Sequence, residues 1–149
     1  MSTKPVPDGY HTVTPYLVLE NASRAIEFLK RALGAEVTFM MKGDDGSVRH
    51  AEVKVGDSML MLGQAGGEWK ARPMTFYLYV PDCDAVYKQA IAAGAKSLHE
   101  PANQFYGDRH GGVEDADGNQ WWIATHIEDV SEDEMARRMK AAAPQATTA

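Results

Sequence analysis

The chain of 149 residues has a single cysteine, no long apolar run and no cluster of basic residues. A lone Cys83 cannot form an internal disulfide, and one thiol is too few for a cysteine-rich zinc site. No stretch has the 18 or so consecutive apolar residues of a membrane span, and basic runs do not exceed two residues, as in Arg137-Arg138. The net charge is −6, which argues against a surface for nucleic acid or anionic lipid. We therefore expect neither nucleic acid nor a membrane as a partner.

The beginning of the chain has none of the features of a secretion signal. Residues 1–7 lack the apolar core of a signal peptide, so together with the single cysteine they predict a reducing, cytoplasmic location. The composition, 44% hydrophobic and 24% charged, is that of a soluble globular protein. A chain of this length is expected to bury roughly 68–70% of its unfolded surface. One domain spanning residues 1–149 is therefore expected.

An internal repeat organises the chain. Residues 14–21 (TPYLVLEN) resemble residues 75–82 (TFYLYVPD) at an offset of 61, and each run ends in a residue that suits a helix N-cap. Apolar residues at helical spacing follow over 22–33 and 84–93. Gly34 and Gly94 then stop the two helices at matching places. The Arg49-His50 and Arg109-His110 pairs continue the repeat at an offset of 60.

This repeat predicts an α+β fold of two tandem βαβββ modules, at about 10–64 and 72–126. The first copy has extended segments at 36–41, 48–55 and 58–62, with a hairpin turn at 43–46. The second copy is looser, with a long polar connection around 101–107. Outside the repeat, at 128–149, the Ser131 to Glu134 spacing forms a capping box that predicts a short helix to about Lys140, followed by a tail.

Strand alternation indicates which side chains face a ligand. In each module the helix covers one face of the sheet, and two modules can place their open faces around a shared cleft. Residues at i and i+2 on a strand share a face. We therefore expect the cleft to be lined by Thr14, Tyr16, Thr75, Tyr77 and Tyr79 from the first strands, His50 and Glu52 from the third strand, and Leu60 and Trp122 from the last strands. An aromatic cleft with a few polar groups is typical of a site for a small organic ligand.

Three segments resemble a known superfamily when their order and duplication are taken together. They are residues 14–36, residues 50–57 (HAEVKVGD) and residues 104–126, which include QFYGDR and DGNQW. Their pattern is similar to that of the vicinal oxygen chelate superfamily, which contains glyoxalase I, extradiol dioxygenases and bleomycin-binding proteins, and most of all to its PhnB-like branch. The resemblance covers about residues 10–135 and implies the glyoxalase/bleomycin-resistance fold and a homodimer.

The resemblance also implies where a metal would bind. Enzymes of this superfamily hold a divalent metal through one residue on the first and one on the last strand of each module. By spacing, these positions fall on Thr14, Leu60, Thr75 and Trp122, none of which is a usual ligand. We therefore expect no catalytic metal and no cofactor. An error of one residue in the register would exchange the two strand faces and change this assignment.

Two polar groupings remain as candidates. His50 and Glu52 share a strand face, so the carboxylate can orient the imidazole as an acid–base group near neutral pH; the alternative is an ordinary solvated pair. Tyr106 and Arg109 flank a glycine turn and can clamp an anionic or planar ligand; the alternative is an Arg–Asp pair that stabilises the loop. Three other groups are given no site role: Met59 and Met61 as core packing, Cys83 as inert, and His110 and His126 as lacking a suitable carboxylate or lying at a strand end.

The sequence thus predicts a metal-independent protein that holds a small organic molecule in an aromatic cleft. One alternative is an enzyme, either a lyase or isomerase that uses His50 and Glu52, or a metal-dependent lyase or dioxygenase whose ligands lie at other positions. Another alternative is an interaction protein whose dimer is its function.

Overall fold

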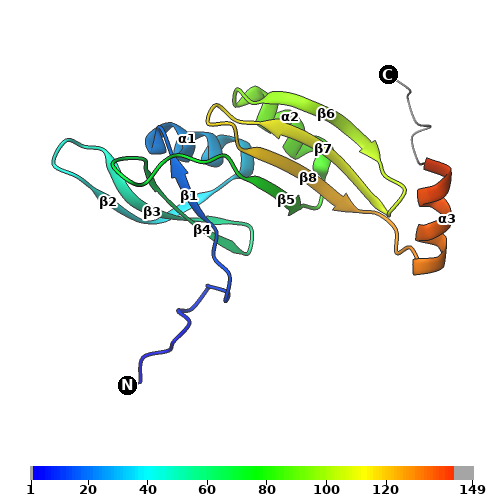
Figure 1. Ribbon diagram of the computed structural model, residues 1–149, viewed down its shortest axis with the longest axis horizontal. Helices are drawn as coiled ribbons and strands as arrows, with labels where there is room; N and C mark the ends of the chain where they lie inside the picture. The colour runs from blue at the N-terminus through cyan, green and yellow to red at the C-terminus, as the bar shows by residue number, and fades with distance from the viewer. Residues whose placement is uncertain (1, 143–149) are drawn as a thin grey trace.

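The computed structural model describes residues 2–142 and consists of two consecutive modules followed by a helix (Figure 1). The first module contains β1 (Tyr16–Leu19), α1 (Ala22–Leu33), β2 (Glu36–Lys42), β3 (Val48–Val55) and β4 (Ser58–Gln64). The second contains β5 (Thr75–Tyr79), α2 (Cys83–Ala92), β6 (Lys96–Asn103), β7 (Asp108–Glu114) and β8 (Gln120–His126), and α3 (Glu132–Ala142) follows. This order confirms the predicted α+β fold of tandem βαβββ modules with a short C-terminal helix. The end of the predicted tail, residues 143–149, lies outside the described residues.

The two sheets have the same topology. Their strand orders are β1-β4-β3-β2 and β5-β8-β7-β6, and in each sheet the first strand runs parallel to the last while the other neighbours are antiparallel. Tyr16 pairs with Met61 in the first sheet, and Tyr77 pairs with Trp122 in the second. Both partners are related by the offset of 61 residues, so the sequence repeat is also a structural repeat.

Local signals fix the N-terminal ends of both repeated helices and the C-terminal end of α1, whereas α2 ends at Ala92, before the predicted Gly94. The Asn21 side chain accepts a hydrogen bond from the backbone N–H of Arg24, and Asp82 accepts one from Ala85. At the C-terminal end of α1, Gly34 adopts a left-handed conformation with φ of 64°. These caps explain why α1 has the predicted bounds.

The core lies between each helix and its sheet. In the first module it is aliphatic, whereas in the second the Trp121 indole stacks on Phe76 with 4.3 Å between ring centroids and donates to the buried Asp115. Leu60 corrects one prediction: it is only 6% exposed and pairs with Val53 on the helix-covered face. The predicted register of β4 is therefore wrong by one residue. Because side chains alternate along a strand, Met61 and not Leu60 lies on the open face, although the sequence predicts that Met61 packs in the core.

The loop before β7 is shorter than predicted. β6 continues to Asn103, so the polar connection covers only residues 104–107. Gly107 has φ of 98°, and a Cβ there would lie 2.2 Å from the carbonyl oxygen of Glu128. The Gly107 carbonyl in turn accepts hydrogen bonds from the backbone N–H groups of Ile127 and Glu128. The segment after β8 therefore fixes the loop that carries Tyr106.

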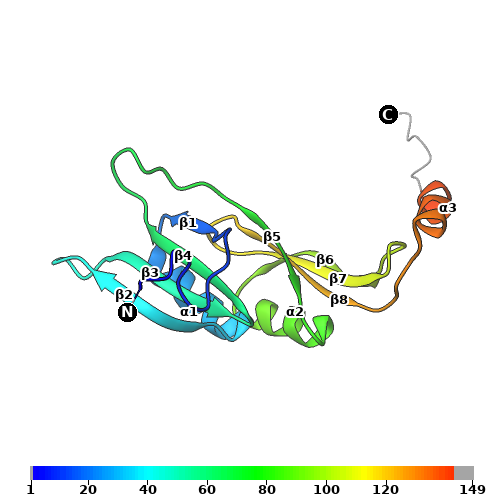
Figure 2. The same cartoon turned by 90° about the horizontal axis from the view of Figure 1, so that it is seen from below.

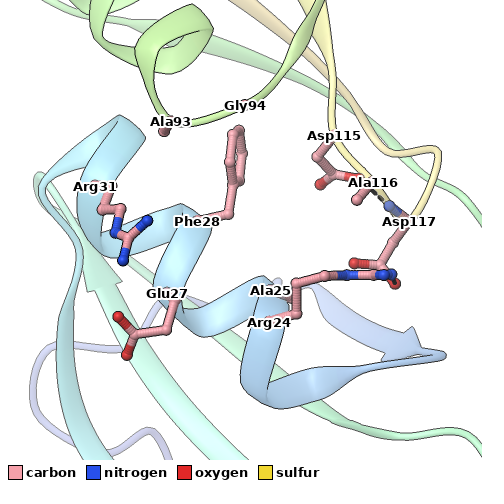
Figure 3. Close-up of a pocket in the computed structure, with 10 residues that line it drawn as sticks. All are labelled: Arg24, Ala25, Glu27, Phe28, Arg31, Ala93, Gly94, Asp115, Ala116 and Asp117. Atoms are coloured by element: carbon pink, nitrogen blue, oxygen red, sulfur yellow. Dashed lines mark hydrogen bonds and ion pairs between the residues drawn. The ribbon is translucent and has the colours of Figure 1, made fainter.

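The modules meet along their helices, with α1 beside α2 (Figure 2). Arg24 pairs with the buried carboxylate of Asp117 at 2.9 Å, and the Gln89 amide donates to the Arg31 carbonyl at 2.7 Å. A hollow of about 280 Å³ lies at this junction, where the Phe28 ring points toward the end of α2 (Figure 3). None of the predicted site residues lines this hollow, so we interpret it as part of the module junction. No helix in the described part of the chain is long and apolar enough to cross a membrane.

Candidate functional site

The open face of the first sheet carries the predicted His50 and Glu52. His50 Nδ1 lies 3.2 Å from the Tyr16 hydroxyl oxygen, and its Nε2 lies 3.7 Å from Glu52 Oε2. The Tyr10 hydroxyl donates a hydrogen bond to Glu52. Burial, together with that carboxylate, raises the pKa of Tyr10 to about 12. The structure therefore brings His50 and Glu52 together and adds Tyr10, which lies in an irregular segment without any sequence pattern.

A pocket opens beside Tyr16 on the same side of the first sheet. Its volume is about 430 Å³, and it is lined by Tyr16, Val18, Arg49, Gly63, Gln64 and Trp69. Gly63 makes room for the tyrosine, because a Cβ there would lie 2.9 Å from the Tyr16 hydroxyl oxygen and 2.8 Å from the Arg49 carbonyl oxygen. Trp69 comes from the loop between the modules and is 75% exposed. A guanidinium and two aromatic rings therefore surround a space of small-molecule size.

The open face of the second sheet is organised around Asp108, which is 4% exposed. Asp108 accepts hydrogen bonds from the hydroxyls of Tyr77 at 2.8 Å and Tyr79 at 3.0 Å, and lies 2.8 Å from His126 Nδ1. Burial alone would raise the pKa of Asp108, but the hydrogen bonds from His126, Tyr77 and Tyr79 outweigh it and lower that pKa. The hydrogen bonds that His126 forms with Asp108 and, to a smaller extent, with Asp129 raise the pKa of His126. This cluster holds a buried carboxylate in its ionised form.

His110 lies next to this carboxylate cluster. Its Nδ1 is 3.2 Å from the hydroxyl oxygens of both Tyr77 and Tyr106. The Trp122 ring lies 5.2 Å from the His110 ring between centroids, and the His99 ring lies 5.9 Å away. Burial lowers the pKa of His110, and the nearby His99 lowers it further. The second face therefore presents a neutral imidazole surrounded by aromatic rings.

Trp122 points to the open face, as strand alternation predicts. Its ring covers Gly112 on the neighbouring strand, because a Cβ on Gly112 would lie 2.6 Å from an indole carbon of Trp122. The adjacent Trp121 points the other way into the core. The position of the indole therefore depends on the absence of a side chain at residue 112.

Arg109 does not face the ligand side. Its guanidinium binds Asp84 on α2 through two hydrogen bonds of 2.7 and 2.9 Å. Because Asp108 and His110 lie on the open face, alternation directs Arg109 to the helix-covered face. The predicted clamp of Tyr106 and Arg109 is therefore wrong, and Arg109 instead forms an Arg–Asp pair, with Asp84 on α2 as the partner.

The first-strand threonines also lie away from the two polar clusters. Thr14 precedes β1, and its hydroxyl donates to the His11 carbonyl at 3.3 Å. Thr75 is exposed at the start of β5. Among the hydrogen bonds of residues 2–142, none joins Thr14 or Thr75 to His50 or His110.

Within one chain, the two open faces are separate from each other. Within the described residues, the aromatic and hydrogen-bond contacts of Tyr16 and His50 stay in the first module, and those of Tyr77 and His110 stay in the second. A hollow of about 470 Å³ at the junction includes Leu60, Tyr77 and Tyr79 but neither histidine. The two open faces of one chain therefore do not form the shared cleft that the sequence predicts.

Some of the residues missed from the sequence did have a signal. The sequence prediction gives His110 no role because no carboxylate stands two residues later, yet Asp108 stands two residues earlier and alternation places it on the same face. His126 lies opposite Asp108 on the neighbouring strand. Trp69 and Arg49 carry no such signal in the sequence. A loop between the modules positions Trp69, and an irregular pairing of β2 with β3 positions Arg49.

Comparison with known proteins identifies the class of this fold. The family model of the glyoxalase/bleomycin resistance protein/dioxygenase superfamily matches residues 10–123. The chain belongs to this superfamily. An uncharacterised protein of Mycobacterium bovis is 30% identical over 138 residues, which cover 85% of this chain and 91% of the relative.

Solved structures share the same fold. TioX from Micromonospora sp. ML1 has a TM-score of 0.69 and 22% identity, covering 78% of this chain and 99% of TioX. A PhnB protein from Bacillus cereus, described as a putative 3-demethylubiquinone-9 3-methyltransferase, has a TM-score of 0.63 and 19% identity, covering 77% and 99% of the two chains. At these identities the likeness concerns the fold.

The donor chemistry at the superfamily's metal positions does not suit a divalent metal. With Leu60 in the core, the open-face position of the last strand in the first module is Met61, and the other positions are Thr14, Thr75 and Trp122. A thioether, two neutral hydroxyls and an indole do not form a site for a divalent metal such as Zn²⁺ or Mn²⁺. Residues 2–142 also contain no group of three or more His, Cys, Asp or Glu placed to hold a metal ion.

Proposed function

We propose that this protein binds a small, partly aromatic organic molecule on its open sheet faces without a divalent metal. The observation that carries the proposal is a repeated pair: Tyr16 with His50, and Tyr77 with His110, each with 3.2 Å between hydroxyl oxygen and Nδ1. Both pairs occupy the faces on which superfamily enzymes hold their metal. Aromatic rings with a few polar groups are the usual lining of an organic ligand site.

The pocket beside Tyr16 supports this proposal. Its volume of about 430 Å³ lies within the roughly 300–1,000 Å³ of small-molecule sites. The rings of Tyr16 and Trp69 offer stacking surfaces, and Arg49 offers a planar cation. The superfamily also includes bleomycin resistance proteins by name, which is in keeping with binding as a function.

The proposal includes a homodimer of the PhnB-like type that acts in the cytoplasm. Large apolar side chains are exposed on the open faces, with Phe39 at 50%, Met41 at 51% and Tyr79 at 66%. A second copy that covered these faces would give the ligand the opposite wall of a cleft. Light scattering after gel filtration tests this assembly: a dimer is expected, Tyr79→Glu should weaken it, and a monomer at all concentrations would contradict it.

Ligand binding is tested by tryptophan fluorescence during titration with substituted phenols and benzoates. Three tryptophans are present, and Trp69→Phe and Trp122→Phe report separately on the two faces, because Trp121 is buried in the core. Quenching that saturates and is lost in one of these variants is the expected result. Elemental analysis tests the metal: one tightly held transition metal per chain would overturn metal independence.

A second candidate function is acid–base catalysis by His50 and Glu52, in a lyase or isomerase reaction. The separation of 3.7 Å between His50 Nε2 and Glu52 Oε2 and the hydrogen bond from Tyr10 to Glu52 favour it. A screen for glyoxalase-type and isomerase turnover decides between the two functions. Turnover that His50→Ala abolishes supports catalysis, whereas binding without turnover supports the first function.

A further inference from the structure

We propose that His110 recognises the hydroxyl group of a planar ligand, a phenol or an enol, by accepting its hydrogen bond at Nε2. This inference rests on the proposed ligand-binding function and names the class of ligand for the second sheet. It also assigns a contact role to a residue outside the first and last strands of the module.

The first step concerns the proton on Tyr77. Asp108 is buried, and an ionised carboxylate only accepts hydrogen bonds. The Tyr77 hydroxyl lies 2.8 Å from Asp108 Oδ2 and must donate its single proton there. The Tyr77 oxygen therefore presents only lone pairs to His110, 3.2 Å away.

The second step fixes the proton on His110. Two lone pairs cannot form a hydrogen bond with each other, so the contact with Tyr77 is a hydrogen bond only when Nδ1 of His110 carries the proton. The Tyr106 hydroxyl oxygen, 3.2 Å from the same nitrogen, then also accepts from Nδ1–H and keeps its own proton. In a neutral imidazole the other nitrogen, Nε2, is then an acceptor. No hydrogen bond among residues 2–142 uses Nε2 of His110. Among the described residues, no protein group therefore competes with a ligand for this nitrogen.

The surroundings of His110 select the kind of donor. The groups that face it are Tyr77 on β5, His99 on β6, Trp122 on β8, Tyr106 on the preceding loop and Asp108 on its own strand. The rings favour a planar molecule. The Asp108 carboxylate disfavours an anion, and Tyr106 can donate to a second oxygen of the ligand. A neutral phenol or enol is planar and uncharged, and its hydroxyl supplies the donor that Nε2 of His110 requires.

The equivalent histidine of the first module provides a contrast. Within the described residues no carboxylate accepts from Tyr16, so its hydroxyl is able to donate to Nδ1 of His50. The Nε2 of His50 then carries the proton and faces Glu52 at 3.7 Å. His50 and His110 are therefore expected to have opposite tautomers, and only His110 offers a free acceptor.

Binding of 4-methylphenol, which is neutral near pH 7, compared with its methyl ether, 4-methylanisole, tests the proposal in the full-length protein. One hydrogen bond contributes about 1 kcal/mol, so the phenol should bind roughly fivefold tighter. His110→Phe should abolish this preference, whereas the matched variant His50→Phe should keep it. Equal binding of both probes, or a preference that survives in His110→Phe, overturns the inference alone. If neither probe binds, both the inference and the proposed ligand class are wrong.

Nitrogen-15 NMR of the unliganded wild-type protein gives a test that needs no variant to fold. Long-range couplings should show the His110 proton on Nδ1 and the His50 proton on Nε2. Tyr77→Phe removes the acceptor for Nδ1–H, and His110 should then shift toward the other tautomer. A wild-type His110 with its proton on Nε2 would overturn the inference.

Discussion

The two modules share a fold and a tyrosine–histidine pair, but they surround that pair differently. In the first module, the carboxylate of Glu52 lies beside Nε2 of His50. In the second, the carboxylate lies behind the tyrosine and leaves Nε2 of His110 without a protein partner among the described residues. The same pair of side chains therefore has two different hydrogen-bonding capacities.

The two modules differ in sequence at the positions of the carboxylate cluster. Asp108 corresponds to Val48 at the offset of 60, and Tyr79 corresponds to Val18 at the offset of 61. Burying a carboxylate costs free energy unless hydrogen bonds compensate it, and three side chains do so here. Val48 is buried in the core on the side of α1, because the pairing of β2 with β3 is irregular next to it, whereas Asp108 lies on the open face. The polar cluster is therefore a feature of the second module that the repeat does not place on the open face of the first.

The largest expected difference between the modules is the loss of unfolding free energy when a core side chain is removed. Trp121 corresponds to Leu60, and it stacks on Phe76 and donates to Asp115. Trp121→Ala should lower the free energy of unfolding by about 3–5 kcal/mol. Leu60→Ala should cost less, roughly 2–3 kcal/mol, because it removes less volume and no hydrogen bond. Urea unfolding measures both. Trp122→Ala is the control, and a cost equal to that of Trp121→Ala would contradict the assignment of faces.

A smaller effect is expected where glycine makes room for an aromatic ring. Gly112→Ala in the second module pushes the Trp122 ring away and should cost about 1–3 kcal/mol, with weaker quenching by ligand. Gly63→Ala is the counterpart in the first module, because it meets the Tyr16 hydroxyl. Gly66→Ala is the control, since nothing lies within 4 Å of its Cβ. Unfolding midpoints that match that control would contradict the close packing.

The ionised cluster should make the stability of the second module depend on pH in both directions. The pKa of His126 is raised, so its contribution is complete below the ordinary value of about 6.5 and is lost as the pH rises through the folded value. The pKa of Asp108 is lowered, so its contribution is complete above about 3.9 and is lost as the pH falls through the folded value.

Urea midpoints measured across this range test the cluster. His126→Gln should flatten the alkaline limb of the profile, and Asp108→Asn should bring the His126 pKa, followed by NMR, back toward its ordinary value. His11→Gln, in the exposed N-terminal segment, is the control. An unchanged alkaline limb in His126→Gln would show that the Asp108 pair contributes nothing to stability.

The features predicted well are those with local causes. The bounds of α1 follow from Asn21 and Gly34, which act within one turn of the helix. The face of Leu60 was wrong because the register of β4 depends on a turn and on pairing with β1, which spacing alone does not fix. Arg109 was misplaced for a similar reason, since its partner Asp84 lies 25 residues away on a helix.

The smallest expected effect is a difference in ligand affinity between substitutions of the two repeated arginines, Arg49 and Arg109. Arg109 is bound to Asp84, whereas the position matched to Asp84 in the first module is Ser23, and Arg49 lines the pocket with Tyr16. Arg49→Gln should therefore weaken binding of a benzoate probe to the first face by a few-fold at low salt, because an exposed ion pair contributes only about 0–1 kcal/mol. Arg109→Gln should leave benzoate affinity unchanged, since its guanidinium faces α2. Fluorescence titration of both variants measures this difference, and equal losses would mean that the two arginines face the same way despite their different partners.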